Sequence, residues 1–237
     1  MVVTEYAIPA PEGSGAVFAF VSDIHECDTK PALEALGKAN ADALLVGGDY
    51  VHNAQKCVKG FEFLRAAASL LPVFCSFGNH ELRVDGICEK TAETGAVPLD
   101  NSDVLFRGFR IGGLTSGVFY EEQKTKKVTP PPDQRWLKEF SEKDGYKILL
   151  CHHPEYYEPY IKPLGIDLTL SGHAHGGQWR FFRRGLYAPG QGLFPKYTSG
   201  MYDGRLIVSR GLGNPHAVPR VNNAPEFIVL KIGNASG

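Results

Sequence analysis

Two histidines with one residue between them carry the clearest chemical signal in this sequence. They are His173 and His175, and they lie in the glycine-flanked segment 171–177. Imidazole is a common ligand of zinc, iron and similar ions, so two rings in one tight loop can reach a single metal ion or two adjacent ones. The flanking glycines disfavour a regular helix and let the backbone come close to a bound group. Taken alone, the segment fits a polar loop with two solvated histidines equally well.

Four other stretches place further metal-binding residue types directly after predicted strands. These residues are Asp23, His25, Asp49, Asn79, His80 and His152. In open α/β sheets, ligands bind beyond the carboxyl ends of the strands, so we expect these side chains to meet at one edge. Each has an ordinary alternative, because Asp and Asn also shape turns and caps. Their occurrence at all of these strand ends favours one shared site.

The elements that must position these residues alternate in the first part of the chain. An edge strand is expected first, followed by apolar runs that are typical of strands buried on both faces. The expected strands are 4–8, 16–21, 43–46 and 73–76. Helices are expected at 31–39, with Thr29 as N-cap, and at 58–70. This alternation predicts a parallel sheet with right-handed crossovers.

The second half of the chain predicts a second sheet. Short strands are expected on both sides of Gly108, and a helix at 133–140 follows three consecutive prolines. The expected strands are 104–109, 110–114, 147–150 and 166–170, and two closing strands, not assigned to either sheet, are expected at 206–209 and 227–232. The stretch 178–202 is rich in glycine, aromatic residues and arginine, and it shows no clear periodicity. Because no repeat or linker composition interrupts the chain, residues 1–237 are interpreted as one domain with two sheets.

Composition narrows the classes of function. Hydrophobic residues make up 43% and charged residues 22% of the chain, as in soluble globular proteins. The net charge of -1 supplies no broad basic field that would hold an anionic membrane, and it disfavours a stable nucleic-acid partner. The five cysteines are odd in number and form no C-x-x-C pair. This pattern argues against a disulfide framework and fits a reducing compartment, so we expect a cytoplasmic protein.

The sequence also bears on membrane attachment. No apolar run approaches the roughly 20 residues that span a bilayer, and no signal peptide is present. Met1 nevertheless lies only a few residues before the first expected strand. An earlier native start with an export or anchor segment, and with it membrane association, therefore stays open.

Together the strand-end motifs resemble one enzyme superfamily. The series is Asp23-x-His25, Gly48-Asp49, Gly78-Asn79-His80-Glu81, His152-x-Pro154 and Gly172-His173-x-His175. In this order, and over roughly the whole chain, it resembles the calcineurin-like metallophosphoesterase superfamily. The segment 172–178, with 209–213 and the stretch from Arg220 to Pro225-Glu226, is similar to a bacterial branch of phosphodiesterases of the YkuE and YaeI type. Members of that branch often carry an N-terminal membrane segment.

The resemblance implies a four-layer α/β/β/α sandwich with two mixed β-sheets around two metal ions, which would be manganese, iron or zinc. By position, the first ion would be held by Asp23, His25 and His175, the second by Asn79, His152 and His173, and both by the bridging Asp49. Two ions about 3.5–4 Å apart can clamp the attacking and leaving oxygens of a displacement at phosphorus. A bridging carboxylate offsets the repulsion between them. The implied reaction is hydrolysis of a phosphodiester or phosphomonoester by metal-activated water or hydroxide.

Three nearby residues receive other assignments. By resemblance, His80 would lie near the leaving-group oxygen as a general acid or a stabiliser of the transition state, and Glu81 would orient its ring. The alternative for His80 is a turn histidine bonded to the backbone. Either ring of the pair at 152–153 could bind the metal, and we choose His152 over His153 because it stands two residues before Pro154, as in the family pattern.

The segment after the histidine loop is the candidate substrate-binding loop. It contains Phe181, Phe182, Arg183 and Arg184, which offer aromatic faces and cations to a phosphate ester. Such an ester would carry an amphiphilic or nucleotide-sugar-like portion. A contact with a membrane surface is an alternative role. An ordinary hairpin with inward aromatic residues and solvated arginines is another.

Three readings of the function follow from these residues. The complete ligand set favours a metal-dependent phosphoester hydrolase. One alternative is a metal-binding scaffold on the same fold without turnover. A nuclease or nucleotide phosphodiesterase is a further alternative, which the lack of a broad basic surface disfavours.

Overall fold

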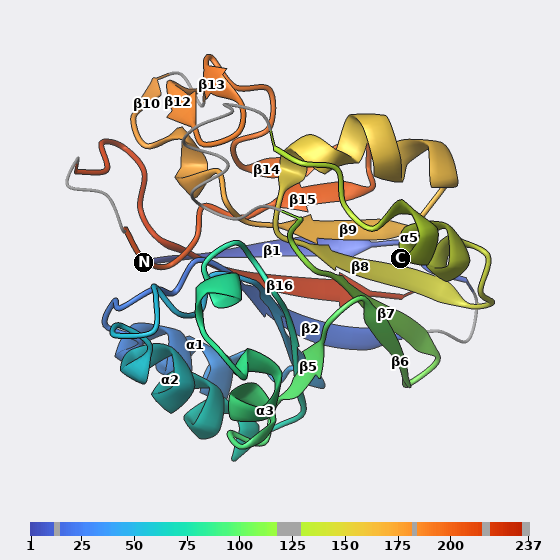
Figure 1. Ribbon diagram of the computed structural model, residues 1–237, viewed down its shortest axis with the longest axis horizontal. Helices are drawn as coiled ribbons and strands as arrows, with labels where there is room; N and C mark the ends of the chain where they lie inside the picture. Colours follow the sequence, from blue (N-terminus) through green and yellow to red (C-terminus); the bar gives the residue numbers. More distant parts are fainter. Residues whose placement is uncertain (12–14, 118–128, 182–183, 215–218, 234–237) are drawn as a thin grey trace.

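Two six-stranded sheets lie face to face in the computed structural model, with helices on the outer face of each sheet (Figure 1). The structure describes residues 1–11, 15–117, 129–181, 184–214 and 219–233. This arrangement is the predicted four-layer α/β/β/α sandwich with two mixed sheets, so the predicted fold class is confirmed. The extent of the domain, 1–237, stays a prediction. Within the described residues, we find no helix with the length and apolar character that a membrane span requires.

The first sheet is formed mainly by the first half of the chain. In spatial order its strands are β1 (Val2–Ile8), β16 (Glu226–Ile232), β2 (Ala16–Val21), β3 (Ala43–Gly47), β4 (Val73–Ser76) and β5 (Val97–Leu99). All neighbours are parallel except β16 and β2. The helices of this half are α1 (Lys30–Lys38), α2 (Val58–Ala68) and α3 (Ile87–Ala92), and they lie on one side of this sheet (Figure 1).

The second sheet is formed by the second half of the chain. In spatial order its strands are β14 (Gly200–Tyr202), β15 (Leu206–Val208), β9 (Leu168–Ser171), β8 (Tyr146–Cys151), β7 (Phe109–Leu114) and β6 (Ser102–Phe106). The four inner strands are parallel, and the two edge pairs are antiparallel. Helix α5 (Gln134–Ser141) begins after Asp133, whose carboxylate accepts a hydrogen bond from the Trp136 amide at 3.0 Å. Short 3₁₀ and π turns follow β8 over 154–164.

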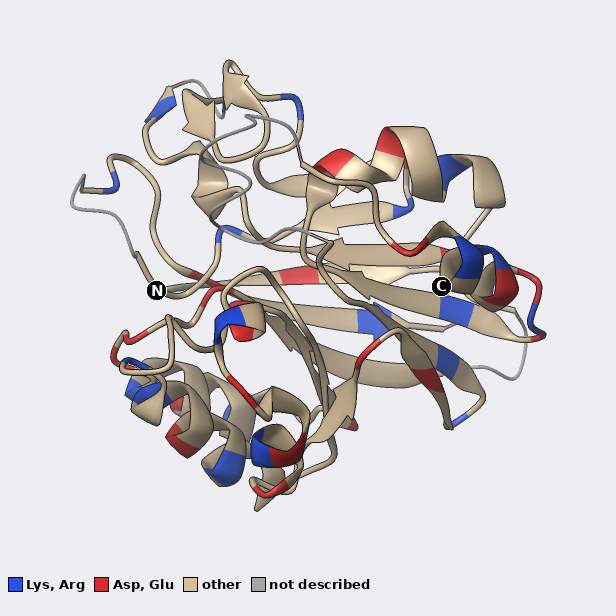
Figure 2. Cartoon of the chain, viewed as in Figure 1, with Lys and Arg blue, Asp and Glu red and all other residues tan. Residues whose placement is uncertain are grey.

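Alternation along β2 shows how the two faces of a central strand serve two cores. Phe18 and Phe20 point into the core between the sheets, where Phe18 packs edge-on against Phe109 with ring centroids 5.4 Å apart. Ala19 and Val21 belong to the core beneath the helices. Charged residues mark the helices and outer loops more than the middle of the strands (Figure 2). Because both faces of β2 pack against apolar cores, its nearest charged residue, Asp23, stands just after the end of the strand.

Several expected elements differ in detail. The hairpin around Gly108 is present, but its second strand begins at Phe109, because Arg107 and Gly108 form the turn with φ of 50° and 83°. Thr29 stands at the N-cap of α1 without a side-chain capping bond. Four two-residue strands were not expected in 178–202: β10 (Arg180–Phe181), β11 (Arg184–Gly185), β12 (Tyr187–Ala188) and β13 (Gly192–Leu193). They form a lobe beside the sheets (Figure 1).

Candidate metal centre

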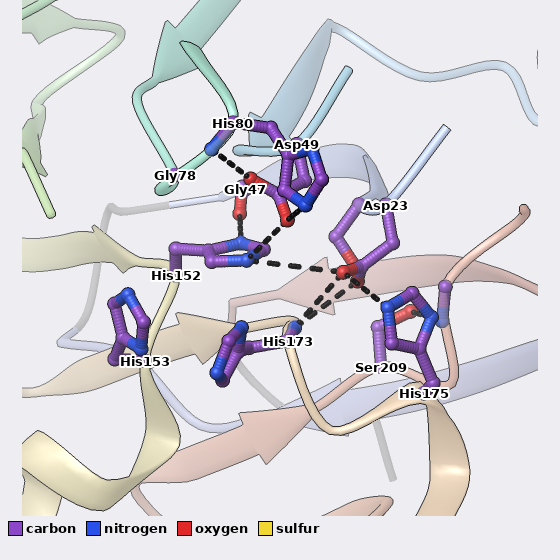
Figure 3. A network of polar contacts seen from close by, with 12 residues as sticks. Asp23, Gly47, Asp49, Gly78, His80, His152, His153, His173, His175 and Ser209 are labelled. Atoms are coloured by element: carbon purple, nitrogen blue, oxygen red, sulfur yellow. Dashed lines mark hydrogen bonds and ion pairs between the residues drawn. The ribbon is translucent and has the colours of Figure 1, made fainter. Parts of the chain in front are cut away.

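The loops after β2, β3, β8 and β9 bring six of the seven predicted metal ligands to one place, and Figure 3 shows five of them, Asp23, Asp49, His152, His173 and His175. Backbone bonds tie these loops together, because the Asp23 amide donates to the Gly48 carbonyl at 3.0 Å and the Gly172 amide donates to the His152 carbonyl at 3.1 Å. A further bond links the two sheets, since the His173 amide donates to Asp23 Oδ1 at 3.1 Å. The ligands are therefore placed by a hydrogen-bonded set of strand ends.

Five of these residues have left-handed backbone conformations. The φ angles are 51° at Asp23, 47° at His25, 54° at Asp49, 64° at His173 and 45° at His175. Positive φ is uncommon outside glycine, and such strain tends to collect at functional sites. The packing around these loops holds the residues in this conformation, which aims their side chains at a common point.

Asp23, His25 and His175 form the first ligand group. Their ligand atoms lie within 4.8 Å of one another, and all three side chains are buried. His175 Nε2 lies 3.5 Å from Asp23 Oδ1. This is the group that was predicted to hold the first metal ion.

Asp49, His152 and His173 form the second group, again with ligand atoms within 4.8 Å. His152 Nε2 lies 3.0 Å from Asp49 Oδ2. Its Nδ1 lies 2.7 Å from the Gly47 carbonyl oxygen, which can only accept, so Nδ1 carries the proton and Nε2 faces the cluster. Asn79, the remaining predicted ligand of this group, is buried.

Asp49 lies between the two groups. Its Oδ2 is 3.0 Å from His152 Nε2 in the second group and 3.9 Å from His25 Nε2 in the first. Its other oxygen, Oδ1, accepts a hydrogen bond from the His80 amide at 3.0 Å. This position is the one that a bridging carboxylate would need.

Unsatisfied buried atoms test whether these residues fit metal ions. Among the described residues, both ring nitrogens of His25, Asn79 Oδ1 and His152 Nε2 are buried without a partner in hydrogen-bond geometry. Burying such atoms unpaired is costly, and native proteins rarely do so. The donor set of imidazole nitrogens, carboxylates and an amide oxygen suits zinc, iron or manganese. The residues present therefore fit a metal centre.

The pKa shifts of His25, His173 and Asp49 agree with this interpretation, whereas the raised pKa of His152 means that a metal ion at its Nε2 would have to displace a proton. Burial lowers the pKa of His25 and of His173 well below the usual histidine value, so both rings are neutral at pH 7, as metal ligands must be. Burial by itself would raise the pKa of Asp49, but the neighbouring His152 and His80 hold it well below its usual value. Burial would likewise lower the pKa of His152, but the Asp49 carboxylate raises it to about 10.

His80 lies at the side of this cluster. Its Nδ1 lies 2.5 Å from the His52 carbonyl oxygen, so Nδ1 carries the proton. Its Nε2 lies 3.9 Å from Asp49 Oδ2, and its ring centroid is 4.7 Å from that of His25. The His52 ring packs beside both, 5.0 Å from His80 and 5.6 Å from His25. The backbone hydrogen bond of the turn alternative is therefore present. Because this bond holds Nδ1, it leaves Nε2 facing the cluster, as the predicted catalytic role requires.

Glu81 requires a correction, because its hydrogen bonds do not go to the ring of His80 that it was expected to orient. Its Oε2 accepts from the amides of Asp49 at 2.7 Å and Gly78 at 2.8 Å, and its Oε1 accepts from the Val51 amide at 3.0 Å. Burial and the Asp49 charge raise its pKa to about 8. Glu81 therefore fixes the backbone of the loops after β3 and β4, and acts on His80 only through that backbone.

His153 is turned away from Asp49. Its Nε2 lies 2.6 Å from Ser116 Oγ and its Nδ1 lies 3.1 Å from Glu155 Oε1, so both nitrogens are engaged. Its ring packs against His173, with centroids 4.2 Å apart. This geometry supports His152 as the ligand of the pair. Glu155 was not singled out in the sequence, because a single acid after Pro154 carries no signal of its own.

Two residues near the C-terminus also contact the histidine loop. Asn223 Nδ2 donates to the carbonyls of His175 at 2.7 Å and Gln178 at 3.1 Å. Arg220 Nη2 lies 3.3 Å from His175 Nδ1. Because these contacts join positions more than forty residues apart, no local pattern in the sequence predicts them.

Two of the four predicted substrate-binding residues, Phe181 and Arg184, lie in the lobe. Phe181 and Arg184 face each other across β10 and β11, and both are exposed. Phe182 and Arg183 lie outside the described residues. The role of Phe181 and Arg184 with substrate stays a prediction.

Comparisons with known proteins agree with the resemblance found in the sequence. Residues 16–177 match the family model described as calcineurin-like phosphoesterase. The chain is 27% identical over 217 residues to the uncharacterized protein YpbG of Bacillus subtilis, covering 90% of this chain and 79% of YpbG. It is 28% identical over 234 residues to phosphodiesterase YaeI of Escherichia coli, covering 90% and 80%. It is 26% identical over 217 residues to the uncharacterized metallophosphoesterase YkuE of Bacillus subtilis, covering 86% and 72%.

Proposed function

Since the chain belongs to the calcineurin-like phosphoesterase family and is a phosphoester hydrolase, we propose that it hydrolyses a phosphodiester at a centre of two metal ions. The observation that carries this proposal is the position of Asp49 between two separate ligand groups. A single metal site would need only one of these groups. The unsatisfied buried atoms in both groups support the same conclusion.

Seven side chains would hold the ions. Asp23, His25 and His175 would bind the first, Asn79, His152 and His173 the second, and Asp49 both. When bound, the ions would supply Lewis-acid activation of the phosphate ester and of the attacking water. Manganese, iron and zinc all suit the donor set.

His80 would handle the proton of the leaving group. Its Nδ1–H is fixed on the His52 carbonyl, so Nε2 is the atom that can exchange a proton at the cluster. In the protonated ring, Nε2–H would donate to the leaving oxygen as the ester bond breaks. General acid–base catalysis of this kind contributes typically ~10²–10⁴-fold.

A diester is the preferred substrate class because one relative of this chain, YaeI, is named a phosphodiesterase. The remainder of the substrate would be amphiphilic or nucleotide-sugar-like. The part of the substrate that extends beyond the metal ligands would contact Phe181, Phe182, Arg183 and Arg184. No stable nucleic-acid partner is expected, given the net charge of -1.

A comparison of two small esters tests the proposal. The chain would be stripped with a chelator and reloaded with manganese, zinc or ferrous iron, and bound metal would be counted by mass spectrometry. We expect two ions per chain, hydrolysis only after reloading, and faster hydrolysis of bis-p-nitrophenyl phosphate than of p-nitrophenyl phosphate. Two bound ions without hydrolysis of either ester would support the non-catalytic scaffold instead. Faster hydrolysis of the monoester would overturn the diester preference.

A further inference from the structure

The lobe that follows the histidine loop carries an unusual surface. We call residues 179–181 and 184–197, with strands β10 to β13, the aromatic lobe. Its exposed large apolar side chains are Trp179, Phe181, Tyr187, Leu193 and Phe194. Leu193 is 68% exposed and Phe194 79%, which leaves both with little protein to pack against. Tyr187 and Leu193 are cross-strand partners on β12 and β13, so these apolar groups are neighbours rather than scattered.

The charge of the lobe is also one-sided. No aspartate or glutamate occurs in the sequence between Asp167 and Asp203, whereas the same stretch contains Arg180, Arg183, Arg184 and Lys196. Lys196 Nζ lies 2.7 Å from Glu158 Oε2, so its charge is paired, and the positive charge of the described lobe comes from Arg180 and the exposed Arg184. Figure 2 shows blue and no red on this part of the molecule.

The lobe is attached directly to the metal-binding loop. The Leu186 amide donates to the Gly177 carbonyl at 3.0 Å, and Arg180 Nη1 donates to the Gly176 carbonyl at 2.8 Å. A Cβ at Gly177 would collide with the backbone of Gly185, so the two segments are packed backbone to backbone. These bonds join the lobe to the loop that carries His175, and Trp179, the first exposed apolar residue of the lobe, stands four positions after His175.

We propose that the aromatic lobe is an interfacial surface that docks on an anionic phospholipid membrane, next to the metal centre. Aromatic and aliphatic side chains insert at the boundary of headgroups and acyl chains, while nearby cations attract anionic headgroups. The observed combination of exposed Leu193 and Phe194 with Arg184 and no acidic residue matches both requirements. If the proposed function holds, this orientation would present the site to phosphate esters of membrane lipids.

Nucleic acid is the other polyanion that aromatic and cationic residues can bind. Stacking on bases requires flat aromatic faces along a basic groove. Here Leu193, an aliphatic residue that offers no flat face to a base, is one of the two most exposed apolar side chains of the lobe. The lobe therefore fits a lipid surface better than a single strand.

Vesicle sedimentation of the manganese-loaded chain tests the docking surface. The vesicles would contain phosphatidylcholine with phosphatidylglycerol in equal parts, or phosphatidylcholine alone. The variant carries Leu193→Ser and Phe194→Ser. Its matched control carries Leu70→Ser and Leu105→Ser, which remove two leucines of similar exposure, 61% and 66%, outside the lobe. We expect the wild type and the control to bind the anionic vesicles and the lobe variant to bind roughly 10- to 100-fold more weakly, as the loss of two inserted apolar side chains predicts.

Fluorescence locates the contact. The chain has two tryptophans, and Trp136 packs on Phe140 in α5 while Trp179 is exposed on the lobe. In a Trp136→Phe background, brominated acyl chains should therefore quench the remaining tryptophan. Absence of wild-type binding to anionic vesicles, equal binding of the lobe variant, or no quenching would each overturn the proposal. So would lobe-dependent binding of a fluorescent single-stranded oligonucleotide without vesicle binding.

The membrane result and the catalytic result can be separated. Vesicle binding needs no turnover, and bis-p-nitrophenyl phosphate hydrolysis needs no membrane. We expect the lobe variant to hydrolyse the soluble ester at the wild-type rate, because the side chains of Leu193 and Phe194 are exposed and cannot bind a metal ion. A protein that binds vesicles but hydrolyses no ester would contradict the proposed function and leave the docking surface intact.

Discussion

Substitution of Gly176 by alanine should separate backbone strain from the packing that positions His175. Gly176 has φ of 64°, a conformation that costs an L-residue about 1–2 kcal/mol. A Cβ there would also lie 2.8 Å from Cγ and Nδ2 of Asn223 and closer still to its Oδ1. Asn223 would have to move, and its two hydrogen bonds to the loop carbonyls would weaken. Each such bond contributes about 0.5–1.5 kcal/mol, so the total loss is roughly 2–5 kcal/mol.

Gly165 offers a matched control. Its φ is 67°, yet a Cβ there would meet nothing within 4 Å, so Gly165→Ala carries the conformational cost alone. In a chain of this size, 1 kcal/mol lowers Tm by about 2–4 °C. We therefore expect Gly176→Ala to lower Tm at least about twice as much as Gly165→Ala, measured by circular dichroism. The loss of Tm in Asn223→Ala should lie between the losses in these two variants.

Activity completes the test. Asn223 holds the His175 carbonyl, so its displacement shifts a proposed metal ligand, and a shift of about 1 Å can cost on the order of 10²-fold in rate. Gly176→Ala should thus lose manganese affinity and diester turnover, whereas Gly165→Ala should keep both. Equal losses of Tm in the two variants, with wild-type turnover in Gly176→Ala, would refute the idea that Asn223 positions the loop.

Three further predictions concern the centre and the surface. Asp49→Asn should abolish turnover and weaken the binding of both metal ions. A variant that retained two ions by mass spectrometry and full activity would disprove the bridging role of Asp49. His80→Ala should keep its metals and lose roughly 10²-fold or more in turnover, the scale of a general acid; metal loss would make it a ligand instead. Burial by itself would raise the pKa of Asp103, but hydrogen bonds and charge from Lys143 and Arg110 hold it below its usual value. Its carboxylate therefore adds stability above about pH 3.9 that is lost as the pH falls through the lowered pKa. Asp103→Asn should lower Tm more at pH 7 than at a pH below the lowered pKa, and an equal difference at both would contradict this.

The sequence predicted the central strands because their physical signature is local. Phe18 to Val21 and Leu44 to Val46 are apolar on both faces, since each strand packs against a sheet on one side and helices on the other. A polar residue directly after such a run, such as Asp23 or Asp49, stands out for the same reason. Where ligands follow buried strands, both the fold and the site are readable from one chain.

The parts that were missed depend on contacts between distant segments. Glu81 bonds to backbone amides on two loops, and Asn223 reaches a loop that precedes it by 48 positions. Neither contact leaves a spacing pattern. The strands of the aromatic lobe have only two residues each, too short for alternation to show. These strands are held by close packing between glycine backbones, as between Gly177 and Gly185, and not by a periodic apolar face.

The hydrogen bond from His173 to Asp23 spans 150 positions of the chain, and this span governs when the centre is completed during synthesis. Asp23, His25, Asp49 and Asn79 leave the ribosome long before the three histidines of the second sheet. At about 5–20 residues per second, the 200 residues from position 23 to Asn223 take roughly 10–40 s to make. Over that interval the nascent chain carries only the carboxylates, one amide and one imidazole of the centre, and its first sheet still lacks β16. Stable metal capture therefore belongs to the last stage of biosynthesis, and a ribosome stalled before His152 should hold a nascent chain that retains manganese only weakly.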